Sequence, residues 1–159
     1  DLRAAGSGLG SAGFVVYDDT ADMVAVARTF ARFLHVESCG QCGACKTHSG
    51  AISDLLARVE HGAADDHHIE EIGARLRIVT DQNRCHVPVE LQTVVASTLR
   101  AFPDEFVARL EGRPRPARLH PLPKIVDLAG GTVTYDRRAA LEQPDWTYAP
   151  LPTPERRAG

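Results

Sequence analysis

The chain has 159 residues, a length that suggests one domain, or one domain with an appended tail. Hydrophobic residues make up 43% and charged residues 25%, as in globular proteins that bury a core. The net charge of −3 and the aromatic content of 6% do not favour nucleic-acid binding, which uses basic patches and stacking rings. The longest uncharged apolar run, residues 13–17, is far too short to span a bilayer, so we predict no direct membrane insertion.

The start of the chain predicts the end of a β module. Residues 1–13 are rich in glycine, serine and alanine and contain no apolar core of a secretory signal. Residues 14–17 read Phe-Val-Val-Tyr and predict a short strand. Because one strand is not stable alone, we interpret residues 1–20 as the end of a module that lies elsewhere.

Two helices are predicted on either side of a cysteine-rich loop. The first begins near Ala21, after an N-cap at Asp19 or Thr20, and ends at Gly40. The second begins within the loop and stops at residues 61–62. Apolar residues recur in both at three- and four-residue steps. They are Met23, Val26, Ala27, Phe30, Phe33 and Leu34 in the first, and Ile52, Leu55, Leu56 and Val59 in the second.

The next segment predicts two further helices and an extension. One starts after residues 65–66 and runs toward Asn83, and the other has Pro88 in its first turn. Beyond Pro103 the pattern continues as a kinked extension or a short fifth helix. Short linkers favour antiparallel neighbours, so residues 21–112 predict a four-helix bundle and a mainly α fold. The stripe residues are Ile69, Ile72, Leu76, Val79, Leu91, Val94, Val95, Leu99, Phe106, Val107 and Leu110.

Residues 113–159 form a tail rich in proline and arginine. Within it, residues 124–128 and 132–135 predict a β-hairpin with a glycine turn. The tail carries more apolar residues than a disordered segment would. We therefore expect it to dock on a neighbouring subunit or on the upstream part of its own subunit.

Four cysteines carry the chemistry: Cys39, Cys42, Cys45 and Cys85. The first three have the spacing C-x2-C-x2-C, which can offer three thiolates to three irons of a cluster, and Cys85 is the only candidate for the fourth. A helical hairpin fills the 40 positions from Cys45 to Cys85, and two antiparallel helices return the chain to its starting end. The spacing therefore predicts four ligands of one [4Fe–4S] cluster. Gly40 and Gly43 would let backbone N–H groups approach the sulfides.

Other interpretations of the cysteines stay open. A four-cysteine zinc site uses the same ligands, although it usually comes as two C-x2-C pairs. It would make the chain a zinc-stabilised helical interaction module without redox activity. Disulfides, unligated thiols and a cluster-free scaffold are further alternatives. Lys46, beside Cys45, could offset a cluster's negative charge or could simply face solvent.

The segment from Gly6 to about Leu110 resembles the C-terminal part of the 51 kDa flavoprotein subunit of respiratory complex I, and of the diaphorase subunits of NAD-linked hydrogenases and formate dehydrogenases. Two differences stand out: this chain has Ala44 before the third cysteine, where the family has proline, and Lys46-Thr47-His48 after it, where the family has Arg-Glu-Gly. The residues that carry the resemblance are Gly8 to Asp18, Phe33 to Cys45 with Glu-Ser-Cys-Gly-x-Cys-x-x-Cys, Cys85, Ser97-Thr98-Leu99-Arg100 and Phe102.

The resemblance implies a function. It implies a helical domain with one [4Fe–4S] cluster that passes single electrons between a flavin and a further redox centre in an NADH dehydrogenase. It also implies that residues 1–20 are the end of an upstream β-grasp-like module. FMN and NAD would be bound only by upstream parts, so this chain alone is not expected to be catalytic. Its expected partners are other subunits or upstream domains of a redox complex, with a cytoplasmic location peripheral to the membrane.

Overall fold

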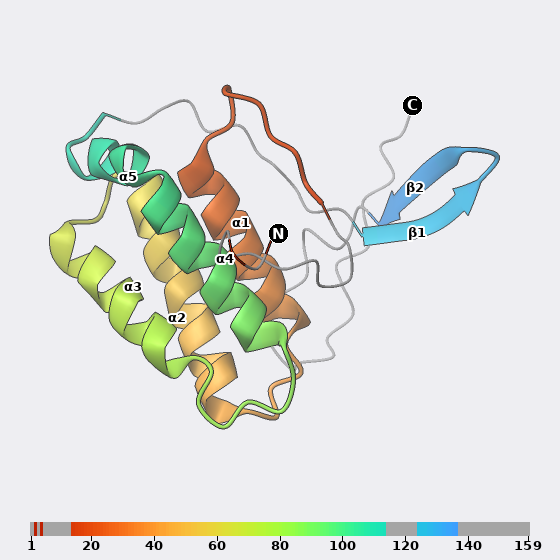
Figure 1. Ribbon diagram of the computed structural model, residues 1–159, viewed down its shortest axis with the longest axis horizontal. Coiled ribbons are helices and arrows are strands. Elements are labelled where there is room, and N and C mark those ends of the chain that lie inside the picture. Colours follow the sequence, from red (N-terminus) through yellow and green to blue (C-terminus); the bar gives the residue numbers. More distant parts are fainter. Residues whose placement is uncertain (1, 3, 5–13, 114–123, 137–159) are drawn as a thin grey trace, which may run out of the picture.

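The computed structural model describes residues 2, 4, 14–113 and 124–136. Helices α1 to α4 run side by side with alternating direction, and α5 lies at one end of them (Figure 1). This confirms the prediction of a mainly helical fold. The elements are α1 (Met23–Glu37), α2 (Gly43–Glu60), α3 (Asp66–Ile78), α4 (Val87–Ala101), α5 (Pro103–Leu110), β1 (Lys124–Ala129) and β2 (Thr132–Asp136).

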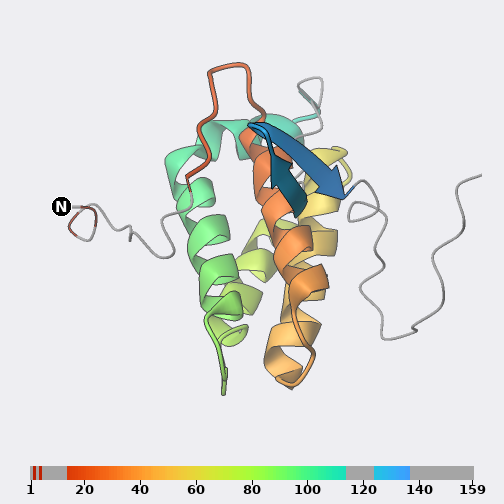
Figure 2. The ribbon, with the colours of Figure 1, turned by 90° about the vertical axis from the view of Figure 1, so that its right-hand side faces the viewer.

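The core lies between the four long helices. Helix α1 packs against α2 and α4, and α2 also packs against α3. The α1–α2 loop and the α3–α4 loop lie at the same end of the bundle in both ribbon views (Figures 1 and 2). The largest fully buried apolar side chains are Ile52, Leu56, Ile72, Leu91, Val24, Val59, Val79 and Val95.

The apolar face of α1 matches the predicted stripe at Val26, Ala27 and Leu34, which are buried, and differs from it at other positions. Val24, Ala27 and Ala31 are wholly buried, whereas Phe30 and Phe33 are only half-buried. Small side chains therefore make up much of the buried face of α1, and Phe33 packs against the core while partly exposed.

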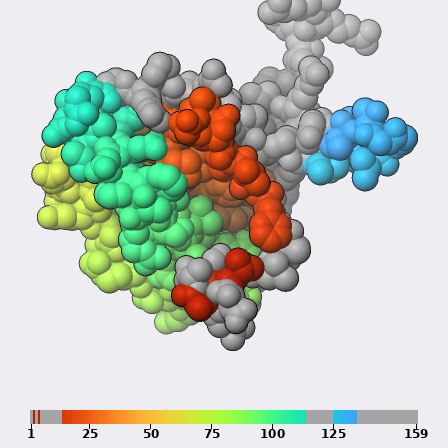
Figure 3. All heavy atoms as spheres, turned by 45° about the horizontal axis from the view of Figure 1, so that its top comes forward, coloured from red at the N-terminus to blue at the C-terminus, as the bar shows by residue number. Residues whose placement is uncertain are grey.

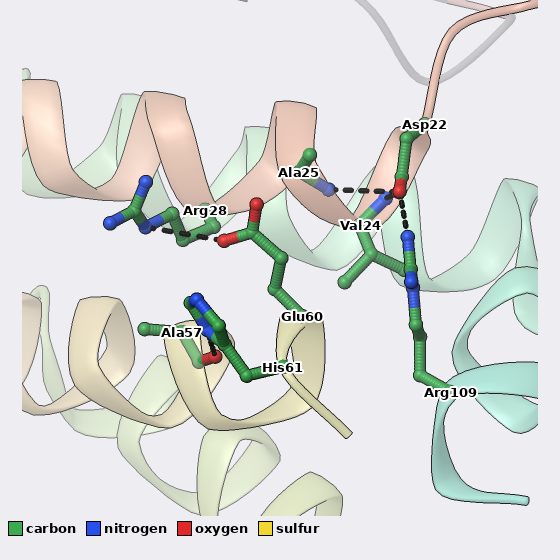
Figure 4. Close-up of polar contacts among 8 residues, drawn as sticks. All are labelled: Asp22, Val24, Ala25, Arg28, Ala57, Glu60, His61 and Arg109. Atoms are coloured by element: carbon green, nitrogen blue, oxygen red, sulfur yellow. Dashed lines mark hydrogen bonds and ion pairs between the residues drawn. The ribbon is translucent and has the colours of Figure 1, made fainter. Parts of the chain in front are cut away.

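The N-terminus of α1 is capped by Asp22, so the prediction of Asp19 or Thr20 is wrong. Asp22 Oδ1 accepts hydrogen bonds from the amides of Val24 at 3.0 Å and Ala25 at 3.1 Å. The same carboxylate forms an ion pair with Arg109 of α5 (Figure 4). Close by, Arg28 of α1 pairs with Glu60 of α2 at 3.5 Å. This end of the bundle is therefore tied together by charge as well as by apolar packing.

Helix α3 ends at Ile78, five residues before the predicted end at Asn83. From Ile78 onward the backbone forms turns, in which Asp81 N donates to Ile78 O at 2.8 Å and Asn83 N to Thr80 O at 3.2 Å. Gln82 has a φ of 53°, in the left-handed region that ends a regular helix. The helix therefore stops early and leaves a loop that leads to Cys85.

Pro103 starts a separate helix and does not kink α4. Phe102 ends α4 with φ −130° and ψ 47°, and Pro103 occupies the first turn of α5, where its missing N–H is harmless. Of the three stripe residues predicted here, Phe106 is buried, Leu110 is half-buried and Val107 is 46% exposed.

The predicted hairpin is confirmed, but the N-terminal strand is not. Strands β1 and β2 pair antiparallel, and the turn uses Gly130 (φ 57°) and Gly131 (φ 77°). Residues 14–17 form no strand, because no described segment pairs with them. Figure 3 shows the red-orange residues that precede and begin α1 on the outside of the molecule, beside α4.

Two further observations concern the chain as a whole. No helix within the described part is long and apolar enough to cross a membrane. The division into segments 1–20, 21–112 and 113–159 remains a prediction, since much of the first and last segments lies outside the described residues.

Candidate metal centre

The four cysteines lie on the two loops that meet at one end of the bundle. Cys39 follows α1, Cys42 is the N-cap of α2, and Cys45 lies in the first turn of α2. Cys85 lies in the loop just before α4. All four thiols are free; Cys39 and Cys85 are exposed, Cys42 is half-buried and Cys45 is buried. The helical hairpin of α2 and α3 thus returns the chain to the first three cysteines.

The pKa of the Cys45 thiol responds to all three of the other cysteines. Burial raises the pKa of the Cys45 thiol, and the negative charges of Cys42, Cys85 and Cys39 raise it further, in that order. Lys46 acts in the opposite direction and lowers the pKa. Cys85 therefore lies within electrostatic range of Cys45 although 40 positions separate them in the chain. If all four thiols ionised, their negative charges would repel one another. A metal centre would supply the positive charge that stabilises four thiolates at this end of the bundle.

The backbone around the first three cysteines is suited to an anionic group. Gly40 has a φ of 74°, so it turns the chain between Cys39 and Cys42 in a conformation that favours glycine. Cys42 makes no side-chain cap bond to α2. The first N–H groups of a helix lack partners within the helix and carry a partial positive charge. The N-terminus of α2 therefore presents hydrogen-bond donors on the side where the thiols lie.

Lys46 crosses from α2 to the end of α1. Its Nζ donates to His35 O at 2.9 Å, to Ser38 O at 3.3 Å and to Ser38 Oγ at 3.1 Å. Burial lowers the pKa of Lys46, while the charges of Cys45 and Cys39 raise it. Lys46 is half-buried, and its ammonium group is held by hydrogen bonds at the end of α1 instead of simply facing solvent.

Sequence reasoning missed the contact between His35 and Ser49. His35 Nδ1 lies 2.8 Å from Ser49 Oγ, and Ser49 is buried. A Cβ added at Gly50 would come within 2.9 Å of the His35 ring. The glycine therefore lets α1 and α2 approach closely just behind the cysteine loop. The only sequence signal was a glycine inside a helix, where it otherwise costs stability.

A second missed residue supports Cys85. The side-chain amide of Asn83 donates to Cys85 O at 2.8 Å and holds the short turn before α4. Asparagine commonly bonds to backbone two residues on in such turns. The pattern Asn-x-Cys could therefore have been read as a local turn.

The described His, Cys, Asp and Glu side chains contain no group of three or more arranged to hold a metal ion. A four-iron cluster does not need such a group, because each of its cysteines binds a different iron. A single zinc ion would instead need all four sulfurs at about 2.3 Å from one point. The donor set of free thiols, helix N–H groups and one ammonium suits an iron–sulfur cluster, which takes thiolate ligands and carries negative charge.

The fold and the thiol set together define a helical protein with a candidate thiolate metal centre between two loops. The family model described as "NADH-ubiquinone oxidoreductase-F iron-sulfur binding region" matches residues 25–109, more than half of the chain. The chain belongs to this family, and its cofactor is a [4Fe–4S] cluster. This membership gives it a role in iron–sulfur electron transfer.

Similar proteins cover the same region. The NADH-quinone oxidoreductase F 2 subunit of Rhizobium meliloti is 35% identical over 112 residues, which are 70% of this chain and 27% of that protein. The HndC subunit of the NADP-reducing hydrogenase of Solidesulfovibrio fructosivorans is 29% identical over 118 residues, 74% of this chain and 24% of that protein. The NADH-quinone oxidoreductase F subunit of Mycobacterium bovis is 28% identical, with 70% and 25% covered. The chain spans about a quarter of the length of these relatives.

Proposed function

We propose that Cys39, Cys42, Cys45 and Cys85 are the four ligands of a [4Fe–4S] cluster. The observation that carries this proposal is that the α1–α2 loop, which leads into Cys42 and Cys45, and the α3–α4 loop with Cys85 lie at the same end of the bundle. The charge of Cys85 also raises the pKa of the Cys45 thiol. Each thiolate would bind one iron, which uses every cysteine in the chain. The free state of all four thiols supports the same assignment.

The function we propose is the transfer of single electrons between a flavin and a further redox centre of an NADH dehydrogenase. A bound cluster would accept and release one electron at a time. The bundle holds the ligands on two loops and buries the Cys45 side, whereas Cys39 and Cys85 face solvent. The exposed side would give electrons a short path to a partner, and the buried side would keep water from the cluster.

The partners we propose are the upstream flavin-binding part and other subunits of a redox complex. The names of the relatives support this, because they are F subunits of NADH-quinone oxidoreductases and a hydrogenase subunit. The chain spans about a quarter of each of them, so the NADH and FMN chemistry would lie in parts that this chain does not include. We expect the isolated chain to bind no FMN and to oxidise no NADH.

The test is anaerobic purification followed by counts of iron, sulfide, zinc and flavin per chain. We expect four irons and four sulfides, no flavin, and a broad visible absorption that bleaches with dithionite. A colourless protein with one zinc per chain would overturn the proposal in favour of a zinc-stabilised interaction module. Stoichiometric FMN would overturn the assignment of flavin binding to other parts.

A further inference from the structure

We propose that Lys46 is a positioning residue of the metal centre, which closes the cysteine loop and holds a positive charge beside the thiolates. The proposal rests on the assignment of the four cysteines as cluster ligands. It concerns how their loop is held in place and how its charge is balanced.

The first step is the position of the lysine's contacts along the chain. Ser38 directly precedes the first thiol, Cys39, and Lys46 directly follows the third, Cys45. The Lys46 ammonium donates to both the carbonyl and the hydroxyl oxygen of Ser38, at 3.3 and 3.1 Å. One side chain thus joins the two ends of the segment that carries three thiols. This ring closure limits the conformations open to the loop before any metal binds.

The second step is the anchor of this ring on α1. Lys46 also donates to His35 O at 2.9 Å, in the last turn of α1. Ser38 Oγ donates to the same carbonyl at 2.5 Å, and Ser38 is buried. The same carbonyl also accepts from Ser38 N at 3.2 Å, and the last carbonyls of a helix carry partial negative charge. The ammonium is therefore one of three donors that fix the loop to the end of α1.

Lys46 occupies an unfavourable position for a positive charge in its own helix, α2. Lys46 lies in the first turn of α2, where the helix dipole disfavours a positive charge. It is also half-buried, which disfavours the charged form further. The carbonyl oxygens of His35 and Ser38 accept hydrogen bonds from the ammonium and favour its charged form. The charges of Cys45 and Cys39 act in the same direction, although burial, the larger effect, lowers the pKa of Lys46.

The charge has a consequence for electron uptake. A bound cluster would supply one-electron chemistry, and its reduction would add one negative charge to the site. The Lys46 ammonium nearby would stabilise the more negative state and so raise the reduction potential. Removal of the positive charge should therefore shift the potential to a more negative value.

Three variants separate the charge from the hydrogen bonds. Lys46→Arg keeps both, Lys46→Gln keeps a donor but loses the charge, and Lys46→Met loses both. Arg58→Gln is the matched control, because it removes one positive charge from an exposed position at the other end of α2. Each variant is purified anaerobically as the full chain.

Two measurements are made on the loaded protein and one on the apo-protein. The potential is measured by dithionite titration, and cluster retention by the loss of visible absorbance with an iron chelator. We expect Lys46→Met to lower cluster affinity about 10- to 100-fold, as changes to residues that orient metal ligands do. Lys46→Gln and Lys46→Met should both shift the reduction potential to more negative values. Lys46→Arg should keep the potential of the unaltered protein. In the apo-protein, hydrogen exchange of residues 38–46 should become faster in Lys46→Met but not in Arg58→Gln.

Two outcomes would overturn the proposal. One is a potential and a retention that are unchanged in both Lys46→Gln and Lys46→Met, even with faster exchange, because Lys46 would then be a structural cap only. The other is an equal shift of potential in Arg58→Gln, which would reflect net charge. Failure of the ligand assignment has a different signature: the unaltered chain would hold no cluster, or would keep it when a cysteine is replaced.

Discussion

Asp22 and Arg109, 87 positions apart in the chain, form an ion pair in which both side chains are almost wholly buried, at 2% and 3% exposure. The pair joins the first turn of α1 to α5 (Figure 4). Asp22 also caps α1, and Glu105 of α5 accepts a hydrogen bond from Met23 N at 2.9 Å. Helix α5 is therefore held to the start of α1 by two polar contacts, at the end of the bundle opposite to the cysteines.

The first prediction concerns this pair. Arg109→Met should lower the free energy of unfolding by about 3–5 kcal/mol, because the Asp22 carboxylate is left buried without its partner. Urea denaturation of the apo-protein measures the change. Arg113→Met is the control, since Arg113 pairs with Glu111 at the surface and should change stability by less than about 1 kcal/mol. Equal losses in the two variants would show that the buried pair has no special weight.

The second prediction concerns two glycines inside helices. Gly73→Ala should stabilise the apo-protein by about 0.5–1 kcal/mol, because the nearest atom to the added Cβ is the mobile end of Arg77 at 3.9 Å. Gly50→Ala should instead destabilise it, since the new Cβ would meet the His35 ring at 2.9 Å. Thermal unfolding of the two variants compares them directly. Similar gains in both would contradict the close approach of α1 and α2.

The third prediction concerns pH and His35. Burial lowers the pKa of His35, the charges of Lys46 and Arg32 lower it further, and Asp54 raises it. The unfolded chain therefore binds this proton more readily than the folded one. Stability from the neutral His35 is present above about pH 6.5 and is lost as the pH falls through that value toward the folded pKa.

The measurement is the free energy of unfolding of the apo-protein at a series of pH values. His35→Gln should flatten its dependence below about pH 6.5. His67→Gln, at a side chain that is 80% exposed, should leave the dependence unchanged. An equally steep profile in His35→Gln would show that another group causes the loss.

The fourth prediction concerns the fourth ligand. Cys85→Ala should lose the cluster or leave a three-iron form, because Cys85 alone supplies a thiolate from the α3–α4 loop. EPR of the reduced and oxidised protein distinguishes the two results. Thr47→Ala, at an exposed position just after the first turn of α2, should keep the spectrum of the unaltered protein. An unaltered spectrum in Cys85→Ala would contradict the return of the helical hairpin to the first three cysteines.

The fifth prediction concerns the hairpin of β1 and β2. Ile125, Val126 and Leu128 are 65%, 63% and 69% exposed, and a two-stranded sheet is marginal without a surface to lie on. Their joint replacement by serine, or deletion of residues 113–159, should leave the visible absorption intact and weaken assembly with partner subunits. Co-purification of the complex measures this. Thr132→Ser with Thr134→Ser is the control, and assembly unaffected by the deletion would argue against docking.

The sequence predicted the helices best where apolar residues recur at regular steps. Ile52, Leu56 and Ile72 are fully buried as their spacing indicated. The spacing could not show the end of α3, because the apolar pattern carries no signal for the turn around Gln82. It was wrong for part of the apolar face of α1, where Val24 and Ala31 are buried and the larger Phe30 is only half-buried.

For the candidate site, the sequence indicated that the two cysteine-bearing segments lie at the same end of the bundle, but not the contacts that hold these segments. Cysteine spacing is a local signal, and the return of Cys85 follows from the length of a helical hairpin. The bonds of Lys46 and the contact of His35 with Ser49 depend on how closely α1 and α2 approach each other. Asp22 and Arg109 were missed for a similar reason, since nothing local links residues so far apart.

The position of Cys85 has a consequence for the folded chain as a whole. With all four thiolates engaged, the cluster would act as a covalent cross-link between the α1–α2 loop and the α3–α4 loop. By analogy with a disulfide that closes a loop of this length, such a link would reduce the conformational entropy of the unfolded chain. This would stabilise the folded chain by about 4 kcal/mol. Oxidative loss of the cluster would then remove the link between the two loops at this end of the bundle. Exposure to oxygen would therefore lower the free energy of unfolding of the protein.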